Sequence, residues 1–275
     1  MQIEENLQSD KKEVFLPGDL LSDETGFISG TNTYEEQGKI FSSTTGTINQ
    51  TNKLIMIKPI KCSYQPQIGE IVIGQIVQIR DKKWIVNIGS SSEATLHLNS
   101  TYLPEQRQKT EDDEMNMRQI FSENDLICAE VHSVNNDKSV NLHTRGLKYG
   151  KIEDGLLIKV NHYLIVKQKR HFIKLNNNVN MILGHNGQIY LSNQDRTTNN
   201  QKVIYCQNYT VQQRIDIANT GKAIKFLQQN QFKISQTSIE KVLNYISEKK
   251  PQNDWITLIE QFFLEQKSKQ QQQDQ

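Results

Sequence analysis

The chain has 275 residues, a net charge of +1 at pH 7 and three cysteines. This length predicts two or three small domains rather than one. Cys62, Cys128 and Cys206 lie too far apart to indicate a disulfide framework or a zinc site. No apolar run approaches the roughly 20 residues that span a bilayer, and charged residues fill the place where a signal peptide has its apolar core. We therefore expect a soluble intracellular protein with no membrane partner.

The first part of the chain predicts a small all-β domain over residues 14–66, after a disordered N-terminus at 1–13. Short apolar runs, separated by glycine, asparagine or proline turns, begin at Val14 and end at Ile57. Three or four such strands bury little surface by themselves. We therefore expect this domain to pack on a neighbour.

Residues 67–147 predict a five-stranded barrel of the OB type. Apolar runs with strand periodicity occupy residues 71–79, 84–88, 94–98, 126–134 and 140–144. Gly74 interrupts the first run, which suggests a bulge or a bend of the barrel. The connection before the fourth strand predicts a short acidic helix, because Thr110 begins a Thr-x-x-acid capping box and Glu114 can pair with Arg118.

Residues 148–265 predict an α+β domain, followed by a disordered polar tail at 266–275. Strand patterns cover residues 156–160, 163–166, 179–183 and 188–191. The periodicity then becomes helical, and three helices are expected to begin near Val211, Thr237 and Asp254. Gly221 could interrupt the first of them.

Positive charge gathers after the last predicted strand of the barrel. From Arg145 to Lys174 there are eight Lys and Arg residues against two acids. Such an excess is typical of a surface that binds a polyanion, and a solvated basic face is the alternative.

The candidates for contact with a single-stranded nucleic acid are cations and rings of the barrel and of the turn that follows it. They are Lys82, Lys83, Trp84, His97, Arg145, Lys148 and Lys151. His97 alternates out of phase with its apolar neighbours, so we expect it to face solvent. Trp84 alternates in phase with Val86, which favours a core position for its ring.

Two segments of the barrel resemble the S-one (S1) domain family, named after a ribosomal protein. Residues 93–98, Glu-Ala-Thr-Leu-His-Leu, are similar to strand three of that family, in which a surface histidine contacts RNA. Residues 139–145, Ser-Val-Asn-Leu-His-Thr-Arg, are similar to its closing strand, which ends in a basic residue at the RNA face. The family carries a pair of aromatic residues on strand two, whereas this sequence has Trp84 alone at that strand.

A wider resemblance covers nearly the whole chain. Pro17-Gly18-Asp19, the hinge at 142–151 and the loop at 184–187 occur in the same order as in certain cap subunits of the RNA exosome. Those subunits combine an N-terminal domain, an S1 domain and a KH domain, and the hinge is similar to the ribosomal-RNA-processing (Rrp-four) type. The resemblance implies that residues 148–265 form a KH-like domain.

The loop Gly184-His185-Asn186-Gly187 has the Gly-x-x-Gly spacing with which KH domains clamp nucleic acid. It carries no Lys or Arg, and its flanks have strand patterns. Asn186-Gly187 indicates a hairpin turn with positive φ at the glycine. We therefore interpret these four residues as a structural loop at a domain junction.

Enzyme signatures are missing from the sequence. We expect no catalytic residues, no metal and no cofactor. The acids from Glu111 to Glu114 could in principle hold Mg²⁺. Consecutive acids at a helix start point in different directions, however, and they complement the helix dipole.

The resemblance to exosome cap subunits implies a non-catalytic RNA-binding protein that stabilises the ring of the complex. It would guide single-stranded RNA to a nuclease for 3′-to-5′ processing and decay. The implied partners are single-stranded RNA, ring subunits resembling phosphorolytic ribonucleases, other cap subunits and associated nucleases, in the nucleus, nucleolus and cytoplasm. A freestanding OB/KH RNA-binding factor is the alternative, and a metal-dependent nuclease is a distant third.

Overall fold

The computed structural model describes residues 14–23, 26–102, 110–135, 137–146, 148–193 and 209–249. The disordered ends and the helix near Asp254 that the sequence predicts lie outside these residues. The chain divides into two compact units, Met1–Cys62 and Ser63–Gln275, which are described separately below.

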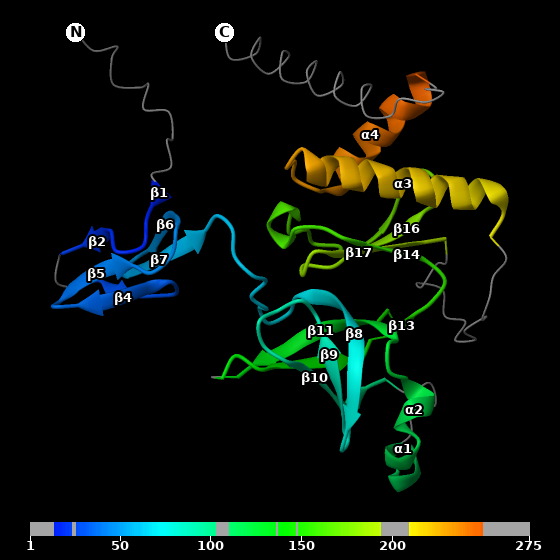
Figure 1. The fold of residues 1–275 in the computed structure, drawn as a ribbon, viewed down its shortest axis with the longest axis horizontal. Helices are drawn as coiled ribbons and strands as arrows, with labels where there is room; N and C mark the ends of the chain where they lie inside the picture. The colour runs from blue at the N-terminus through cyan, green and yellow to red at the C-terminus, as the bar shows by residue number, and fades with distance from the viewer. Residues whose placement is uncertain are drawn as a thin grey trace. The chain divides into compact units, whose positions relative to one another are not determined.

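The N-terminal unit consists of short strands in two sheets (Figure 1). One sheet has the order β1-β6-β7-β3 and the other the order β2-β5-β4. The strands are β1 (Val14–Phe15), β2 (Leu20–Ser22), β3 (Ile28–Ser29), β4 (Thr33–Glu36), β5 (Lys39–Ser42), β6 (Gly46–Thr51) and β7 (Leu54–Pro59). The all-β prediction is confirmed, although it missed β2 and β4. Residues of these two strands are mostly exposed or half-buried, so they lack the apolar alternation that marks a strand.

The second unit begins with a closed five-stranded barrel, as predicted. Its strands are β8 (Ile71–Arg80), β9 (Lys83–Asn87), β10 (Ala94–Thr101), β11 (Leu126–Val134) and β12 (Val140–Thr144). They pair in the order β12-β10-β9-β8-β11, and β12 closes the barrel by pairing with β11 as well. A further strand, β13 (Gly150–Ile152), pairs with β11. The end of the hinge, which we assigned to the next domain from residue 148 onward, is therefore hydrogen-bonded to the barrel.

Gly74 lies in the middle of β8, but the predicted bulge is not at that residue. The register between β8 and β9 shifts between Ile76 and Gln78 instead. A Cβ atom on Gly74 would lie 2.4 Å from Cγ1 of Val86. The glycine therefore allows a close approach between the two strands.

The acidic connection forms two short helices, α1 (Glu111–Met115) and α2 (Met117–Ile120), rather than one. The capping interaction is present, because the backbone N–H of Thr110 donates to the Asp113 carboxylate at 2.9 Å. The expected Glu114–Arg118 pair is wrong. Glu114 pairs with Lys82 in the barrel, at 2.9 Å between Oε1 and Nζ.

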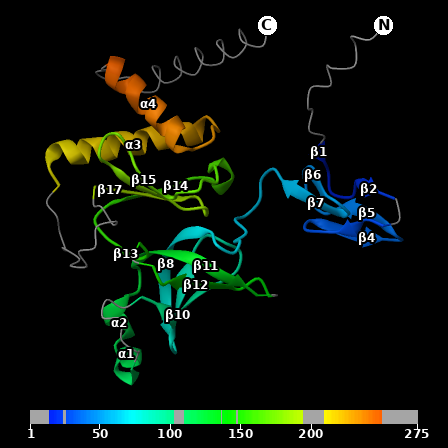
Figure 2. The ribbon, with the colours of Figure 1, turned by 180° about the vertical axis from the view of Figure 1, so that it is seen from behind.

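The C-terminal part of this unit is a four-stranded antiparallel sheet covered by helices (Figures 1 and 2). The sheet has the order β14-β17-β16-β15. Its elements are β14 (Leu156–Lys159), the 3-10 helix η1 (His162–Leu164), β15 (Phe172–Lys174), β16 (Asn180–Leu183), β17 (Gln188–Ser192), α3 (Val211–Gln229) and α4 (Gln236–Lys249). The strand predicted at 163–166 is wrong, because three of its residues take part in η1 or in its C-terminal cap.

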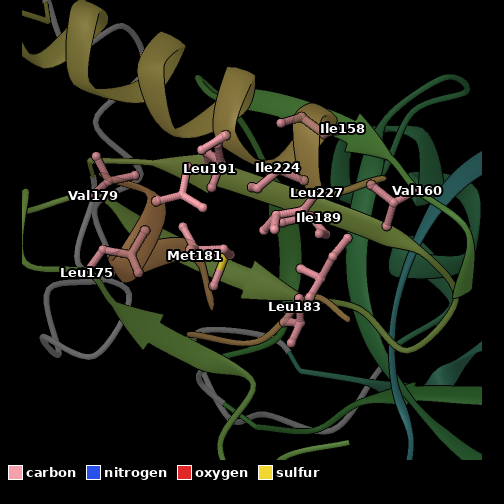
Figure 3. Close-up of a cluster of buried hydrophobic side chains, with 14 of the residues drawn as sticks. Ile158, Val160, Leu175, Val179, Met181, Leu183, Ile189, Leu191, Ile224 and Leu227 are labelled. Atoms are coloured by element: carbon pink, nitrogen blue, oxygen red, sulfur yellow. The ribbon is translucent and has the colours of Figure 1, made fainter. Parts of the chain in front are cut away.

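Alternate side chains of the sheet serve two different cores. Met181, Leu183, Ile189 and Leu191 face the helices, where they pack with Ile224 and Leu227 of α3 (Figure 3). Ile182 and Tyr190 point the other way and pack with Ile73 and Cys128 of the barrel. The sheet therefore has helices on one face and the barrel on the other.

The two described helices differ in detail from the sequence-based expectation. α3 continues through Gly221, whose missing Cβ would lie 2.9 Å from Cδ2 of Leu156, so the glycine allows the helix to approach β14. α4 starts before Thr237, since Ser235 Oγ accepts a hydrogen bond from the backbone N–H of Ser238 at 3.2 Å. Neither helix, nor any other within the described ranges, is long and apolar enough to span a membrane.

Candidate nucleic-acid interface

Three basic side chains form a row across neighbouring strands on the outside of the barrel. Lys83 on β9 lies directly opposite Arg80 on β8 and His97 on β10. His97 and Arg80 are exposed and Lys83 is half-buried. We call Arg80, Lys83 and His97 the basic row. The predicted solvent exposure of His97 is confirmed.

Arg80 is a member of the row that the sequence analysis missed. The signal was available in the hairpin register. A two-residue turn, Asp81-Lys82, places the residues on either side of it opposite each other, so Arg80 must face Lys83 once that turn is assigned. Lys82 adopts a positive φ of 57° at this turn.

Trp84 does not belong to the surface, and its inclusion among the RNA contacts was wrong. The side chain is 0% exposed, and its indole N–H donates to the carbonyl oxygen of Phe121 at 3.1 Å. Its ring packs edge-on against the ring of Phe121 at a centroid distance of 5.3 Å. Because the large apolar ring fills the barrel interior and its polar atom is satisfied there, no face remains for a nucleic-acid base.

The remaining predicted cations fall into two groups. Arg145 and Lys148 are exposed at the end of β12 and in the hinge. Lys82 and Lys151 are each engaged by carboxylates. Hydrogen bonding to Glu114 raises the pKa of Lys82, while Lys151 Nζ lies 3.0 Å from Asp125 and 2.7 Å from Glu153.

The two carboxylates make Lys151 a weaker candidate for a phosphate contact. Burial opposes the charged form, but the hydrogen bonds to Glu153 and Asp125 outweigh it and raise the pKa of Lys151. A phosphate would have to compete with two acids that already neutralise this ammonium group.

The hairpin at 184–187 joins β16 to β17 and lies against the barrel. Gly187 has a φ of +86°, which confirms the predicted turn. The Asn186 side chain, 8% exposed, donates to the carbonyl oxygens of Ile73 and Ile88 at 2.7 and 2.8 Å. The backbone N–H of His185 donates to the carbonyl oxygen of Ile71 at 2.9 Å. In this arrangement the polar groups of the loop form hydrogen bonds that satisfy backbone carbonyl oxygens of the barrel.

An ion pair between a buried carboxylate, Glu70, and an exposed lysine, Lys167, lies next to this hairpin. Glu70, whose side chain is 8% exposed, accepts hydrogen bonds from Lys167 at 2.7 Å and from the Tyr64 hydroxyl at 2.7 Å. Burial alone would raise the pKa of Glu70, but these two hydrogen bonds outweigh it and hold the pKa below its ordinary value. The pair therefore ties the segment before β8 to the loop before β15.

Two histidine rings also meet at this junction. The rings of His171 and His185 lie 4.0 Å apart between centroids. Burial, and then the proximity of His171, lower the pKa of His185 below its ordinary value. Both rings are therefore part of the packing between the barrel and the sheet.

Two of the four acids that could have suggested a metal site are engaged in other interactions. Asp113 caps α1 and Glu114 pairs with Lys82. Within the part of the chain that the structure describes, no group of three or more acids, histidines or cysteines could hold a metal ion.

The barrel, with this histidine and this closing strand, is of the kind found in S1 domains, and the comparison with family models agrees over the barrel region. Residues 63–133 match the family model described as "RRP4, S1 domain". Residues 14–51 match the model described as "Exosome complex exonuclease RRP4 N-terminal region". The chain thus carries an RRP4-type N-terminal region followed by an RRP4-type S1 domain, and the resemblance to this type of exosome subunit is confirmed.

Curated relatives agree with the two family models. The "Exosome complex component rrp4" of Schizosaccharomyces pombe is 42% identical over 192 residues, which are 69% of this chain and 58% of the relative. The "Exosome complex component RRP4" of Mus musculus is 41% identical over 183 residues, or 66% of this chain and 62% of the relative. That of Saccharomyces cerevisiae is 40% identical over 181 residues, or 65% and 50%. The matched region spans less than two thirds of the length of each of these relatives.

Proposed function

We propose that this chain is a non-catalytic, RNA-binding cap subunit of an RNA exosome. In this role it stabilises the ring and guides single-stranded RNA toward a nuclease in another subunit, for 3′-to-5′ processing and decay. The basic row on the S1 barrel is the observation that carries the proposal. The names of the relatives, each an exosome complex component, support the assignment to that assembly.

The basic row is suited to bind single-stranded RNA without preference for a nucleotide sequence. Arg80 and Lys83 supply cations for successive phosphates. The ring of His97, on the neighbouring strand β10, offers a surface on which a base can stack. Arg145 and Lys148 add positive charge beyond β12. Because Trp84 is buried, stacking at the row is limited to one ring, so we expect weak binding with a strong dependence on salt.

The proposed partners of the N-terminal unit are ring subunits resembling phosphorolytic ribonucleases. Its small core leaves Val14, Leu16 and Ile28 more than half exposed, at 52%, 56% and 61%. Exposed apolar side chains of this kind are suited to a protein interface. Other cap subunits and associated nucleases complete the proposed assembly, which we place in the nucleus, nucleolus and cytoplasm.

The absence of catalysis is proposed from the use of the candidate acids. Asp113 is committed to a helix cap and Glu114 to an ion pair with Lys82. A nuclease that works with two metal ions needs carboxylates that converge on one point. Here Asp113 instead serves the N-terminal turn of a short helix, and Glu114 is held by a lysine of the barrel.

The test combines RNA cleavage, RNA binding and co-purification. The purified chain should bind a labelled single strand at low salt and should leave it intact with Mg²⁺ or with inorganic phosphate. A tagged chain expressed in its native source should co-purify with ring subunits. RNA cleavage that disappears in Asp112→Ala/Asp113→Ala would overturn the non-catalytic assignment, and a chain that migrates as a monomer from native extract would favour a freestanding RNA-binding factor.

A further inference from the structure

Four aromatic rings, one exposed and three half-buried, contact one another in succession from the barrel to the C-terminal sheet. The rings of His132 and His143 are 5.5 Å apart between centroids, those of His143 and Tyr149 are 6.3 Å apart, and those of Tyr149 and Phe172 are 6.0 Å apart. We call these four residues the ring strip. They come from β11, β12, the hinge and β15, so the strip crosses from one domain to the next.

The strand register explains why the first two rings meet. The pairing between β11 and β12 shifts between Val131 and Ser133, which leaves His132 as the extra residue of a bulge. A bulge re-aims the side chain that it carries. His132 is exposed and lies beside the ring of His143, whose backbone pairs with Glu130 two residues earlier on β11.

The strip remains accessible along its length, although its far end also touches the core between the domains. His143, Tyr149 and Phe172 are half-buried rather than buried. The last two pack at the edge of the cluster formed by Ile73, Cys128 and Ile182. One side of the Tyr149 ring and one side of the Phe172 ring are therefore held by the protein, which fixes the orientation of these two rings at no further cost in side-chain entropy.

Cations lie beside the middle of the strip and at its Phe172 end. Arg145 and Lys148 are exposed on either side of the hinge residues that lead to Tyr149, and Arg170 and Lys174 are exposed on either side of Phe172. Arg145 is close enough to His143 to lower the pKa of that ring, in addition to the larger effect of burial. Glu130 is an acid in contact with the strip: it accepts a hydrogen bond from the Tyr149 hydroxyl at 2.6 Å, and its Oε1 lies 4.0 Å from Nε2 of His143.

Rings with interspersed cations are the combination that holds single-stranded nucleic acid, because bases stack on the rings and phosphates meet the cations. We propose that the ring strip is a second RNA contact surface, which carries the strand from the barrel onto the C-terminal domain. β10, with His97, pairs with β12, which bears His143 and leads to Arg145. The strip therefore continues the surface that starts at the basic row, and this inference rests on the proposed RNA-binding function.

The strip would give the C-terminal domain a route to RNA that does not use its Gly-x-x-Gly loop. That loop lies against the barrel, where Asn186 bonds to two carbonyl oxygens. Phe172, by contrast, belongs to the edge strand β15 of the same sheet.

The experiment measures the affinity of the full chain for labelled oligo(U) and oligo(A) at low salt. His132→Ala removes the most exposed ring, and His132→Phe keeps a ring without the imidazole. Val134→Ala, at an exposed position two residues along β11, is the matched control. We expect His132→Ala to weaken binding about tenfold, the equivalent of about 1.4 kcal/mol. His132→Phe and Val134→Ala should stay within about twofold of the unsubstituted chain.

A second readout locates the RNA directly. Photocrosslinking with 4-thiouridine RNA, followed by mass spectrometry, should identify peptides that contain Tyr149 or Phe172. If His97→Ala weakens binding while His132→Ala does not, and crosslinks are confined to the barrel strands, the proposed function stands and the ring strip is only interdomain packing. If neither substitution matters, or the chain does not bind RNA at low salt, both ideas are wrong.

Discussion

The hairpin at 184–187 and the basic row on the barrel both resemble nucleic-acid motifs in the sequence, but the structure gives them opposite surroundings. In the hairpin, Asn186 is buried and its amide is bonded to backbone oxygens of Ile73 and Ile88. In the basic row, Arg80 and His97 are exposed beside Lys83. The comparison teaches that a motif reveals what chemistry a segment could offer, whereas burial decides whether a ligand can reach it.

The largest expected effect is on folding, from Gly187→Val. A Cβ atom at this position would lie 2.2 Å from the carbonyl oxygen of Val160, and φ is +86°. We expect a loss toward the upper end of about 2–5 kcal/mol, because steric overlap of about 1–3 kcal/mol adds to a left-handed backbone penalty of about 1–2 kcal/mol. The measurement is chemical denaturation of the full chain.

The matched control for this substitution is Gly89→Val. Gly89 has a similar φ of +78°, but a Cβ there would meet nothing within 4 Å. It should therefore show the backbone penalty alone, about 1–2 kcal/mol. Equal losses at both glycines would mean that the hairpin is not packed tightly against Val160, the residue that follows β14.

Asn186→Ala should destabilise the chain by about 2–3 kcal/mol while RNA affinity remains within about twofold. The substitution leaves the buried carbonyl oxygens of Ile73 and Ile88 without the partner that bonds them at 2.7 and 2.8 Å. Asn99→Ala, at an exposed position of β10, is the control for stability. A tenfold loss of RNA affinity with unchanged melting would identify the hairpin as a nucleic-acid clamp.

Glu70→Gln should change the dependence of stability on pH. The folded-state pKa of Glu70 lies below its ordinary value of 4.5, mainly because Lys167 and Tyr64 outweigh the effect of burial. The carboxylate therefore stabilises the fold above that ordinary value, and the contribution is lost as the pH falls through the lower folded-state pKa.

The measurement is the melting temperature of both chains from pH 7 to pH 3. The difference in favour of the unsubstituted chain should be largest near neutral pH and should shrink below about pH 4.5, the ordinary value for this carboxyl group. Parallel curves over the whole range would show that the ion pair with Lys167 contributes nothing to the junction.

The smallest expected effect is on the salt dependence of RNA binding, and it should differ between Lys83 and Lys151. Each phosphate contact in a single strand contributes about −0.7 to the slope of log K against log salt. Lys83→Ala should flatten this slope by about that amount, since Lys83 lies in the basic row. Lys151→Ala should change it less, because Asp125 and Glu153 already neutralise this lysine. The reverse order would move the RNA path to the hinge.

Much of the barrel could be predicted from the sequence because its strands follow simple alternation. The fourth and fifth strands were placed at 126–134 and 140–144, the bounds that the structure gives to β11 and β12. The exposure of His97 followed from the same period of two. Strands of mostly exposed residues, such as β4, were missed, since no apolar pattern marks them.

The sequence determined the order of domains, the strands of the barrel and the positive φ of Gly187, because each depends on residues that are neighbours along the chain. Only the tertiary structure decided that the Trp84 indole N–H bonds to the carbonyl oxygen of Phe121 and that Asn186 bonds to Ile73, 113 positions away. The same holds for the ring strip, whose members come from separate strands and a hinge. Pairing across strands fixes which side chains meet, and that pairing depends on how the barrel closes and how the sheet packs against it.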